Sequence, residues 1–355
     1  MSSDARLEEK NREGRQIFLD VLRIVACAAV VLMHTVSGVL NGGFDMMGYE
    51  RRVCAFRAIM DATAWCVPIF LIISGYLLLD PRRKMSLREA VFQFGRRVFF
   101  ALVLFGIPYS LIELVGRERA FRPGMLWKAV WNTAVMKSWA HMWYLYLILG
   151  LYLITPLLKI ILGKLPRAVL VGILAVLFCL CSLIPYAEQL CGFETGLCII
   201  PREGIYLFYY LAGYLWAIRR KEGLRREGPL CLGSFAVILI AEMCSRFMPE
   251  YVVDMAYAYP PTLLAALLLF DGCRALAVGQ GKGGNDRLTN LSRLTFGIYL
   301  IHPVFLNFFY KYMGLSPMNF RFFIGVPLFF GIAFLGAAVV TYFLRRIPVL
   351  SKYVL

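Results

Sequence analysis

The chain has 355 residues, of which 60% are hydrophobic and 17% are charged, and it carries a net charge of +16. An ordinary soluble domain is roughly 45–50% apolar and about 25% charged. This composition therefore leaves more apolar surface than a water-soluble fold of this size can bury. A soluble enzyme, a nucleic-acid binder and a disordered chain are excluded as first interpretations, and the sequence predicts a polytopic integral membrane protein.

Ten apolar runs along the chain predict transmembrane helices. Each approaches the roughly 20 residues that a helix needs to cross a bilayer, and the runs are continuous rather than alternating, which favours helices over a β-barrel. The runs lie near residues 17–40, 55–79, 94–115, 143–163, 167–186, 203–218, 230–247, 252–273, 291–311 and 320–344. We expect an all-α fold with a membrane domain at 17–345, a cytoplasmic segment at 1–16 and a cytoplasmic tail at 346–355.

The Lys and Arg residues predict the orientation of these helices. With the N-terminus inside, most of the 38 Lys and Arg residues fall in cytoplasmic segments, among them the basic runs at 82–84, 219–221 and 345–346. Membrane proteins follow this positive-inside rule. The sequence thus predicts a multi-pass protein of the plasma membrane with both termini in the cytoplasm. Its positive charge is attributed to topology and to anionic lipid rather than to nucleic acid.

The first predicted span contains three ionisable residues. Arg23 and His34 are eleven positions apart, about three helical turns, so they share one face and lie about 16 Å apart along the axis. Asp20 precedes Arg23 by three residues and can pair with it. Ionisable groups within a bilayer indicate function by default. A snorkelling Arg23 paired for structure alone and a packed, hydrogen-bonded His34 are the structural alternatives.

The order of these residues along the span suggests a route for a ligand. In the predicted orientation, Arg23 lies in the cytoplasmic third of the membrane and His34 in the outer third. A cation near the cytoplasm and a titratable base near the exterior suit a ligand that enters from the cytoplasm and reacts near the outer surface. Because histidine titrates near neutral pH, His34 is the candidate general base.

Other polar residues are predicted near the outer ends of the spans. Arg57 and Asp61 are four residues apart in the second span and are expected to pair. Glu242 and His302 lie deeper, where a structural role is an equal alternative. A polar vestibule open to the outside is predicted from His34, Glu113, His141 and Glu203. No set of His, Cys, Asp and Glu has the spacing of a metal site, so none is predicted.

Two outer loops leave alternatives open. Residues 116–142 contain Trp127 and Trp131 four positions apart, which is consistent either with a helix lying in the outer membrane interface or with an ordinary amphipathic connector. Cys191 and Cys198 share another outer loop. An oxidising exterior permits a disulfide there, and two free thiols are equally consistent.

Four short motifs occur in order across the predicted spans. The first has the form L-D-x-L-R at 19–23, followed after ten residues by His34. The second, at 67–77, contains P-I-F-L-I-I-S-G-Y, and the third, at 141–156, begins H-M-W-Y-L and ends Y-L-I-T-P. The fourth, at 295–303, is T-F-G-I-Y-L-I-H-P. Together they resemble acyltransferase family 3, polytopic membrane enzymes that modify surface polysaccharides and other acceptors.

The resemblance implies an O-acyltransferase that uses cytoplasmic acyl-CoA, with acetyl-CoA favoured, as its donor substrate and needs no permanently bound cofactor. The implied acceptor is a hydroxylated molecule, with carbohydrate favoured. His34 either deprotonates the acceptor hydroxyl for direct attack on the thioester or forms an acyl-His34 intermediate, while Arg23, positioned by Asp20, binds the pantetheine arm. The implied donor-binding residues are Arg23, Ser74, Tyr76, Arg96 and Arg97, and the acceptor-binding residues are Arg57, Glu113, His141, Trp143 and Tyr144.

The sequence departs from the family pattern at one point. Many members carry Arg-x-x-Arg at the start of the third span, where this chain has adjacent Arg96 and Arg97. A stand-alone membrane domain is expected, without the SGNH-type domain of some members. Two other functions stay open, a transporter without acyl-transfer activity and a membrane domain that handles an amino acid for a partner racemase. Release of CoA by the purified protein distinguishes the enzyme from both.

Overall fold

The computed structural model describes residues 16–41, 48–83, 86–197, 201–218, 227–247, 256–277 and 286–355. Every regular element in these ranges is a helix, which confirms the all-α expectation. Cys198 and the basic run at 219–221 lie outside the described residues. A disulfide between Cys191 and Cys198 and two free thiols therefore both stay open as predictions.

The contacts within the chain divide it into two compact units. Unit 1 comprises Met1–Asp80 and Pro166–Val339, and unit 2 comprises Pro81–Leu165 and Val340–Leu355. Unit 1 holds α2 (Ile17–Leu40), α3 (Glu50–Thr63), α4 (Cys66–Leu78), α10 (Arg167–Phe178), α11 (Ile184–Cys191), α12 (Ile205–Ile218), α13 (Gly228–Ser245), α14 (Pro260–Leu276), α15 (Asp286–Asn307) and most of α16 (Phe322–Leu344). Unit 2 holds α5 (Leu87–Glu89), α6 (Arg96–Ala101), α7 (Ile107–Glu118), α8 (Gly124–Ala134), α9 (Trp143–Leu162) and α17 (Pro348–Tyr353).

Seven helical segments of the described chain are long and apolar enough to cross a membrane, and each coincides with a predicted span. They are Ile17–Leu40, Glu50–Leu78, Arg96–Glu118, Ala140–Leu162, Arg167–Cys191, Gly228–Ser245 and Phe322–Leu344. The other three predicted spans correspond to α12 and α14, which have 14 and 17 residues, and to α15, which has 22 residues but includes Asp286, Arg287 and Arg293. The structure thus supports a polytopic membrane protein, while the count of ten spans and the cytoplasmic termini stay predictions.

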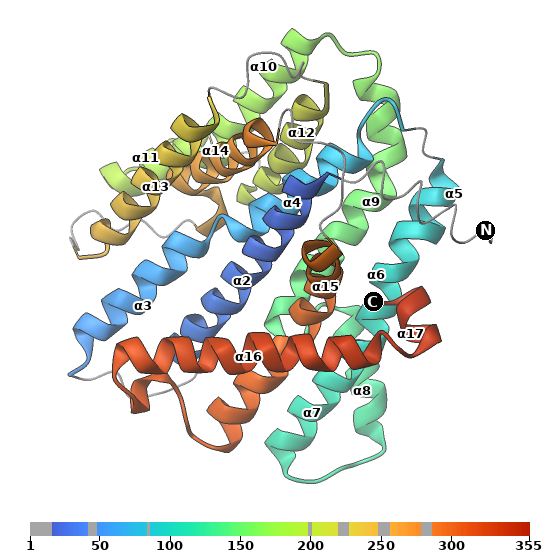
Figure 1. The fold of residues 1–355 in the computed structure, drawn as a ribbon, viewed down its shortest axis with the longest axis vertical. Helices are drawn as coiled ribbons and strands as arrows, with labels where there is room; N and C mark the ends of the chain where they lie inside the picture. The colour runs from blue at the N-terminus through green and yellow to red at the C-terminus, as the bar shows by residue number, and fades with distance from the viewer. Residues whose placement is uncertain are drawn as a thin grey trace. The chain divides into compact units, whose positions relative to one another are not determined.

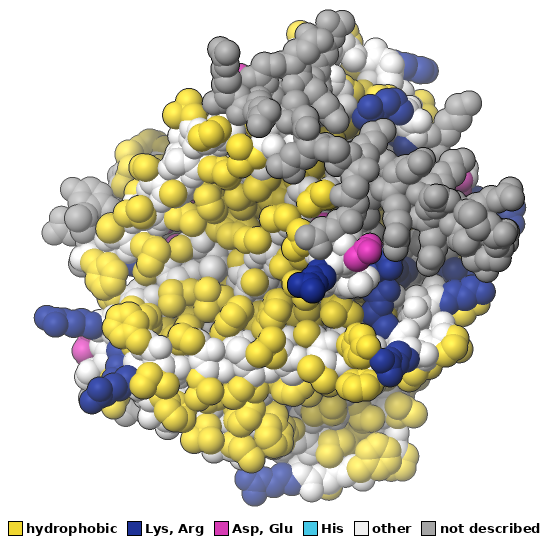
Figure 2. All heavy atoms as spheres, viewed as in Figure 1, with side chains coloured by type: hydrophobic (Ala, Val, Ile, Leu, Met, Phe, Trp, Pro, Cys, Tyr) yellow, Lys and Arg dark blue, Asp and Glu magenta, His cyan; other side chains and the backbone are white. Residues whose placement is uncertain are grey.

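The helix α16 presents large apolar side chains outward. Phe323, Ile324 and Leu335 are 87%, 56% and 64% exposed, and Figure 2 shows hydrophobic side chains spread over much of the face along which α16 runs in Figure 1. Soluble proteins rarely cluster exposed large apolar side chains in this way. Lipid tails are the natural neighbours of these side chains.

Within unit 1, α2 packs against α3, α4 and α15, and α4 packs against α12; Figure 1 shows α2 and α3 side by side. Two glycines allow the backbones of α4 and α12 to approach closely. A Cβ atom on Gly75 would lie 1.9 Å from the backbone oxygen of Tyr210, and one on Gly213 would lie 2.3 Å from the backbone oxygen of Ile72. Small residues at such crossings are typical of helix pairs in membranes.

The outer-loop segment with the two tryptophans forms α8 in unit 2. Met125 and Ala129 are buried and form a small apolar cluster with Leu114 of α7. Trp127 and Trp131 are 73% and 59% exposed. The predicted helix is confirmed, and its position at the membrane interface stays a prediction.

Candidate functional site

The acidic and basic residues of the first span pair as predicted. Asp20 is buried on α2, and its Oδ1 atom lies 3.3 Å from Nη1 of Arg23, whose side chain is 28% exposed. The same Oδ1 atom accepts a hydrogen bond of 2.8 Å from the Ser292 hydroxyl of α15. The Asp20 carboxylate therefore orients Arg23 and also ties α2 to α15.

Three turns further along α2, His34 meets a second histidine. Its Nδ1 atom lies 2.9 Å from Nε2 of His302 on α15, and the two rings stack with their centroids 5.0 Å apart. His302 is fully buried, and its Nδ1 atom lies 3.0 Å from the carbonyl oxygen of Ile298. His34 is half-buried, so its ring is held in place by His302 while part of its side chain stays exposed.

Further polar contacts hold α2 to α15 and the turn that follows it. The Cys27 thiol lies 3.4 Å from the carbonyl oxygen of Thr295, and the Tyr310 hydroxyl donates a 2.8 Å hydrogen bond to the carbonyl oxygen of Thr35. With the contacts of Asp20 and His34, they extend along the length of α2. Polar groups within a bilayer must find partners inside the protein, and this requirement fixes the register of the two helices.

The second motif lies on α4, beside the first turn of α2. The Tyr76 hydroxyl donates a 3.0 Å hydrogen bond to Oε1 of Gln16, and its ring packs edge-on against Phe18 and Phe270. Tyr76 is buried and Ser74 is half-buried. Both residues therefore belong to the unit that holds Arg23 and His34, and their contact with a donor stays a prediction.

A second polar cluster joins α3, α13 and α14, and it corrects one expectation. Asp61 forms an ion pair with Arg246 at the end of α13, with Nη2 of the arginine 2.9 Å from Oδ1 and Nε hydrogen-bonded to Oδ2. The predicted Arg57–Asp61 pair is wrong, because Asp61 binds Arg246 while Arg57 is exposed.

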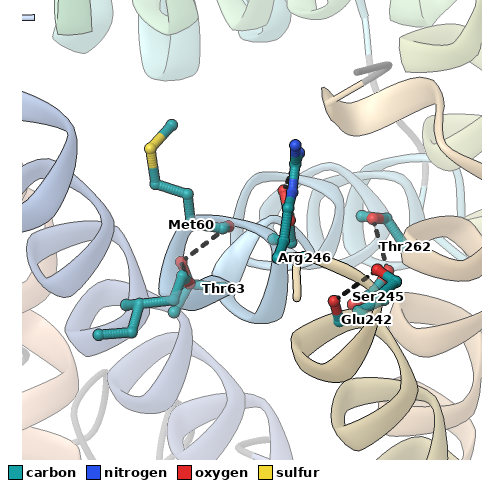
Figure 3. Close-up of polar contacts among 8 residues, drawn as sticks. Met60, Thr63, Glu242, Ser245, Arg246 and Thr262 are labelled. Carbon is teal, nitrogen blue, oxygen red and sulfur yellow. Dashed lines mark hydrogen bonds and ion pairs between the residues drawn. The ribbon is translucent and has the colours of Figure 1, made fainter. Parts of the chain in front are cut away.

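Glu242 lies one turn before Arg246 and is 3% exposed. Its Oε1 atom accepts a 3.0 Å hydrogen bond from Thr262, whereas its Oε2 atom is buried without a hydrogen-bond partner. Figure 3 shows Glu242, Ser245 and Arg246 projecting from α13, with Thr262 of α14 opposite Glu242. Glu242 therefore has a structural contact together with one carboxyl oxygen that nothing in the described chain satisfies.

The predicted donor-binding residues Arg96 and Arg97 belong to unit 2. The Arg96 guanidinium lies 4.8 Å from the ring centre of Tyr353, and Nε of Arg97 donates a 2.9 Å hydrogen bond to the carbonyl oxygen of Val354. These contacts hold the C-terminal segment against α6. Binding of donor phosphates by Arg96 and Arg97 stays a prediction.

The predicted acceptor residues of unit 2 form three groups. Glu113 pairs with Arg117 of the same helix at 3.3 Å. The buried His141 ring faces Tyr109 and Trp139, which stack with their centroids 4.2 Å apart, and the rings of Trp143 and Tyr144 meet edge to face. Of these aromatic groups, the half-buried Trp143 and Tyr144 have ring surface that suits the face of a sugar, and their contact with an acceptor stays a prediction.

Two partners in the site were missed by sequence reasoning. The sequence analysis places His302 deeper in the membrane and does not link it to His34. The two histidines belong to the first and fourth motifs of the same family pattern, and that pattern could have indicated that they act together. Arg246 offered no comparable signal, because Arg57 lies nearer to Asp61 in sequence and the i,i+4 rule favours it.

Comparison with known proteins gives one match. Residues 16–346 match a family model described as an acyltransferase domain. No curated protein and no solved structure matches the chain. The matched range includes all four motifs and both histidines of the α2–α15 contact.

Proposed function

Given that the chain belongs to the acyltransferase family whose model it matches over residues 16–346, we propose that it is a membrane O-acyltransferase. It moves an acyl group, preferentially acetyl, from cytoplasmic acyl-CoA to a hydroxyl of an acceptor at the membrane or the cell exterior. The observation that carries the proposal is a half-buried histidine held in place on the same helix as the Asp20–Arg23 pair.

His34 is the general base of this reaction. It takes the proton from the acceptor hydroxyl as the oxygen attacks the thioester carbonyl carbon. The tetrahedral intermediate collapses, the carbon–sulfur bond breaks, and the imidazolium returns the proton to the departing CoA sulfur. A positioned base of this kind contributes about 10²–10⁴-fold to the rate, and alignment of the two reactants contributes more.

Arg23 binds the donor. Its side chain is partly exposed and is oriented by a buried carboxylate, which is the arrangement that keeps a guanidinium in one place. Because Arg23 lies toward the predicted cytoplasmic end of α2 and His34 toward the outer end, the extended pantetheine arm of acyl-CoA spans the distance between them. Arg23 therefore affects donor binding more than the proton transfer.

The acceptor is a hydroxylated molecule, and carbohydrate is the class we favour. Aromatic rings pack with sugar faces, and the half-buried rings of Trp143 and Tyr144, which meet edge to face in unit 2, provide such a surface. The polar residues near the predicted outer ends of the helices supply hydrogen bonds for hydroxyl groups. These features support a carbohydrate as the class of acceptor.

The test is release of CoA from acetyl-CoA by the detergent-purified protein, compared with His34→Ala and with Ser37→Ala. Ser37 is a half-buried residue one turn further along α2, so its variant is the matched control. Wild type and Ser37→Ala are expected to release CoA, and His34→Ala is expected to lose about 10²–10⁴-fold of that rate.

A binding measurement completes the test. His34→Ala is expected to bind acetyl-CoA with nearly unchanged affinity in equilibrium dialysis, because the base does not hold the donor. Absence of both CoA release and CoA binding by the wild type contradicts the proposed function. Label that stays on the protein after incubation with radiolabelled acetyl-CoA identifies the acyl-enzyme route instead of direct transfer.

A further inference from the structure

The contact between His34 and His302 specifies which ring nitrogen carries a proton. A backbone carbonyl oxygen accepts hydrogen bonds and has none to donate. The 3.0 Å contact between Nδ1 of His302 and the carbonyl oxygen of Ile298 therefore requires a proton on Nδ1 of His302. A carbonyl oxygen has two lone pairs, so it can accept this bond in addition to one within the helix.

This assignment determines the role of the second nitrogen of His302. A neutral imidazole has one N–H donor and one acceptor nitrogen, so Nε2 of a neutral His302 is the acceptor. The alternative, a doubly protonated His302, would bury a cation in a side chain with 0% exposure within a membrane helix, which is costly. The 2.9 Å contact from Nε2 of His302 to Nδ1 of His34 then requires the proton to lie on Nδ1 of His34.

The proton on Nδ1 leaves Nε2 as the acceptor nitrogen of His34. From this geometry we propose that His302 is a positioning residue for acyl transfer, holding His34 in the tautomer whose Nε2 atom is the base. The inference rests on the proposed function. It identifies Nε2 of His34 as the reacting atom and adds His302 as a second residue. His302 does not touch the substrates and acts only through His34.

The proton balance follows from this arrangement. Nε2 of His34 takes the proton of the acceptor hydroxyl as the new carbon–oxygen bond forms, and it gives the proton to the CoA sulfur as the carbon–sulfur bond breaks. Between these events His34 is an imidazolium, and the lone pair on Nε2 of His302 stabilises it through the shared Nδ1 hydrogen bond. A third group that orients a catalytic base in this way is a general feature of nucleophile–base pairs.

The packing around the pair keeps the two rings in register. Asp20 binds Ser292 on one side, and Thr35, the neighbour of His34, binds the Tyr310 hydroxyl on the other. These contacts hold α2 and α15 together without involving either imidazole ring. Substitution of His302 therefore leaves other polar links between the helices intact, which makes the proposal testable without loss of the fold.

The direct test is ¹⁵N NMR of the purified protein labelled at histidine, which distinguishes a protonated ring nitrogen from a bare one. The chain contains three histidines, so the signals are assigned with the single variants His34→Ala, His141→Gln and His302→Gln. We expect protonated Nδ1 and bare Nε2 for both His34 and His302. A protonated Nε2 on His34 overturns the proposal.

The second test is kinetic and compares His302→Phe with His302→Gln. Phenylalanine keeps an aromatic ring at this position but removes the acceptor nitrogen, whereas the amide oxygen of glutamine can accept a hydrogen bond from Nδ1–H of His34. Loss of the hydrogen-bond partner that orients a metal-bound histidine costs about 10–100-fold. By analogy, His302→Phe is expected to lower kcat by a similar factor with an unchanged KM for acetyl-CoA. His302→Gln is expected to recover most of the loss.

The matched control is Tyr310→Phe, which removes the neighbouring hydrogen bond from the turn after α15 to α2 and leaves both histidines. It is expected to lower thermal stability with little effect on kcat. Equal kcat for His302→Phe and wild type, or no recovery in His302→Gln, overturns the positioning role. Absence of turnover in the wild type contradicts the proposed function. In that case the NMR measurement of the histidine tautomers still tests whether His302 holds His34 as inferred.

Discussion

The Nδ1 atom of His34 lies 2.9 Å from the Nε2 atom of His302, and 268 residues of chain separate the two. The contact exists because α15 packs along α2 and several polar groups on the two helices satisfy one another. The half-buried His34 thereby gains a fixed ring orientation from a residue that is itself fully buried.

Asp20→Asn is expected to raise the KM for acetyl-CoA more than it lowers kcat. The substitution removes the charge that orients Arg23 but keeps a side chain that can accept a hydrogen bond from Ser292. Steady-state kinetics with varied acetyl-CoA measures the effect. Ser292→Ala is the control, because it removes the other hydrogen bond to Asp20 and is expected to cost stability, about 0.6 kcal/mol and at most ~1.7 kcal/mol for a hydrogen bond between membrane helices. A rise in KM in Ser292→Ala as large as that in Asp20→Asn contradicts the role assigned to Arg23.

Gly75→Ala and Gly213→Ala are each expected to destabilise the protein strongly. The added methyl group would meet backbone atoms at 1.9 Å and 2.3 Å, and backbone cannot move aside as the end of a side chain can, so α4 and α12 must separate. The midpoint of thermal unfolding in detergent measures this effect. Gly150→Ala on α9 is the control, because a Cβ atom there meets nothing within 4 Å. Equal midpoints for all three variants would show that the close helix approach is wrong.

Asp61 and Arg246 are expected to be coupled in a double-mutant cycle. Removal of either partner leaves a partly buried charge, so Asp61→Asn and Arg246→Met should each destabilise more than half as much as the double variant. Contacting residues in one ion pair show coupling energies of about 0.5–3 kcal/mol. Arg57→Met is the control for loss of an exposed arginine on the same helix as Asp61. A coupling of Asp61 to Arg57 instead would restore the pair that sequence spacing favoured.

The predicted orientation can be tested with single cysteines and a thiol reagent that does not cross membranes. A cysteine at Phe193, in the loop after α11, is expected to react in intact cells, because this loop is predicted to lie outside. A cysteine at Arg167, at the start of α10, is expected to react only after the membrane is opened. The background for both is a variant with its native cysteines replaced, and reaction at Arg167 in intact cells is the result that reverses the orientation.

The local features of the fold could be predicted from sequence alone. Seven predicted spans coincide with membrane-length helices, and the Asp20–Arg23 pair formed as expected because i,i+3 neighbours on a helix meet whatever the rest of the chain does. The spacing of Trp127 and Trp131 likewise depends only on local sequence, and the segment that contains them is helical. The motifs also pointed to the acyltransferase family that the whole-chain match shows.

The pairings between distant helices could not be predicted in this way. Arg57 is close enough to Asp61 in sequence to be its partner, yet Arg246 binds it from α13, because the packing of α3 against α13 places a guanidinium there. The tertiary fold likewise leaves one oxygen of the buried Glu242 without a hydrogen-bond partner. Hydropathy and spacing contain no information on which helix faces which.

What the amino-acid sequence determined by itself was therefore the membrane class, the helical segments, the local ion pair on α2 and the family. These depend on composition and on the geometry of one helix. Only the tertiary structure decided that His34 meets His302, since that contact requires α2 and α15 to pack in one register. Polar groups in an apolar medium stabilise the helix register in which their hydrogen bonds are satisfied. That register depends on contacts between helices far apart in the chain.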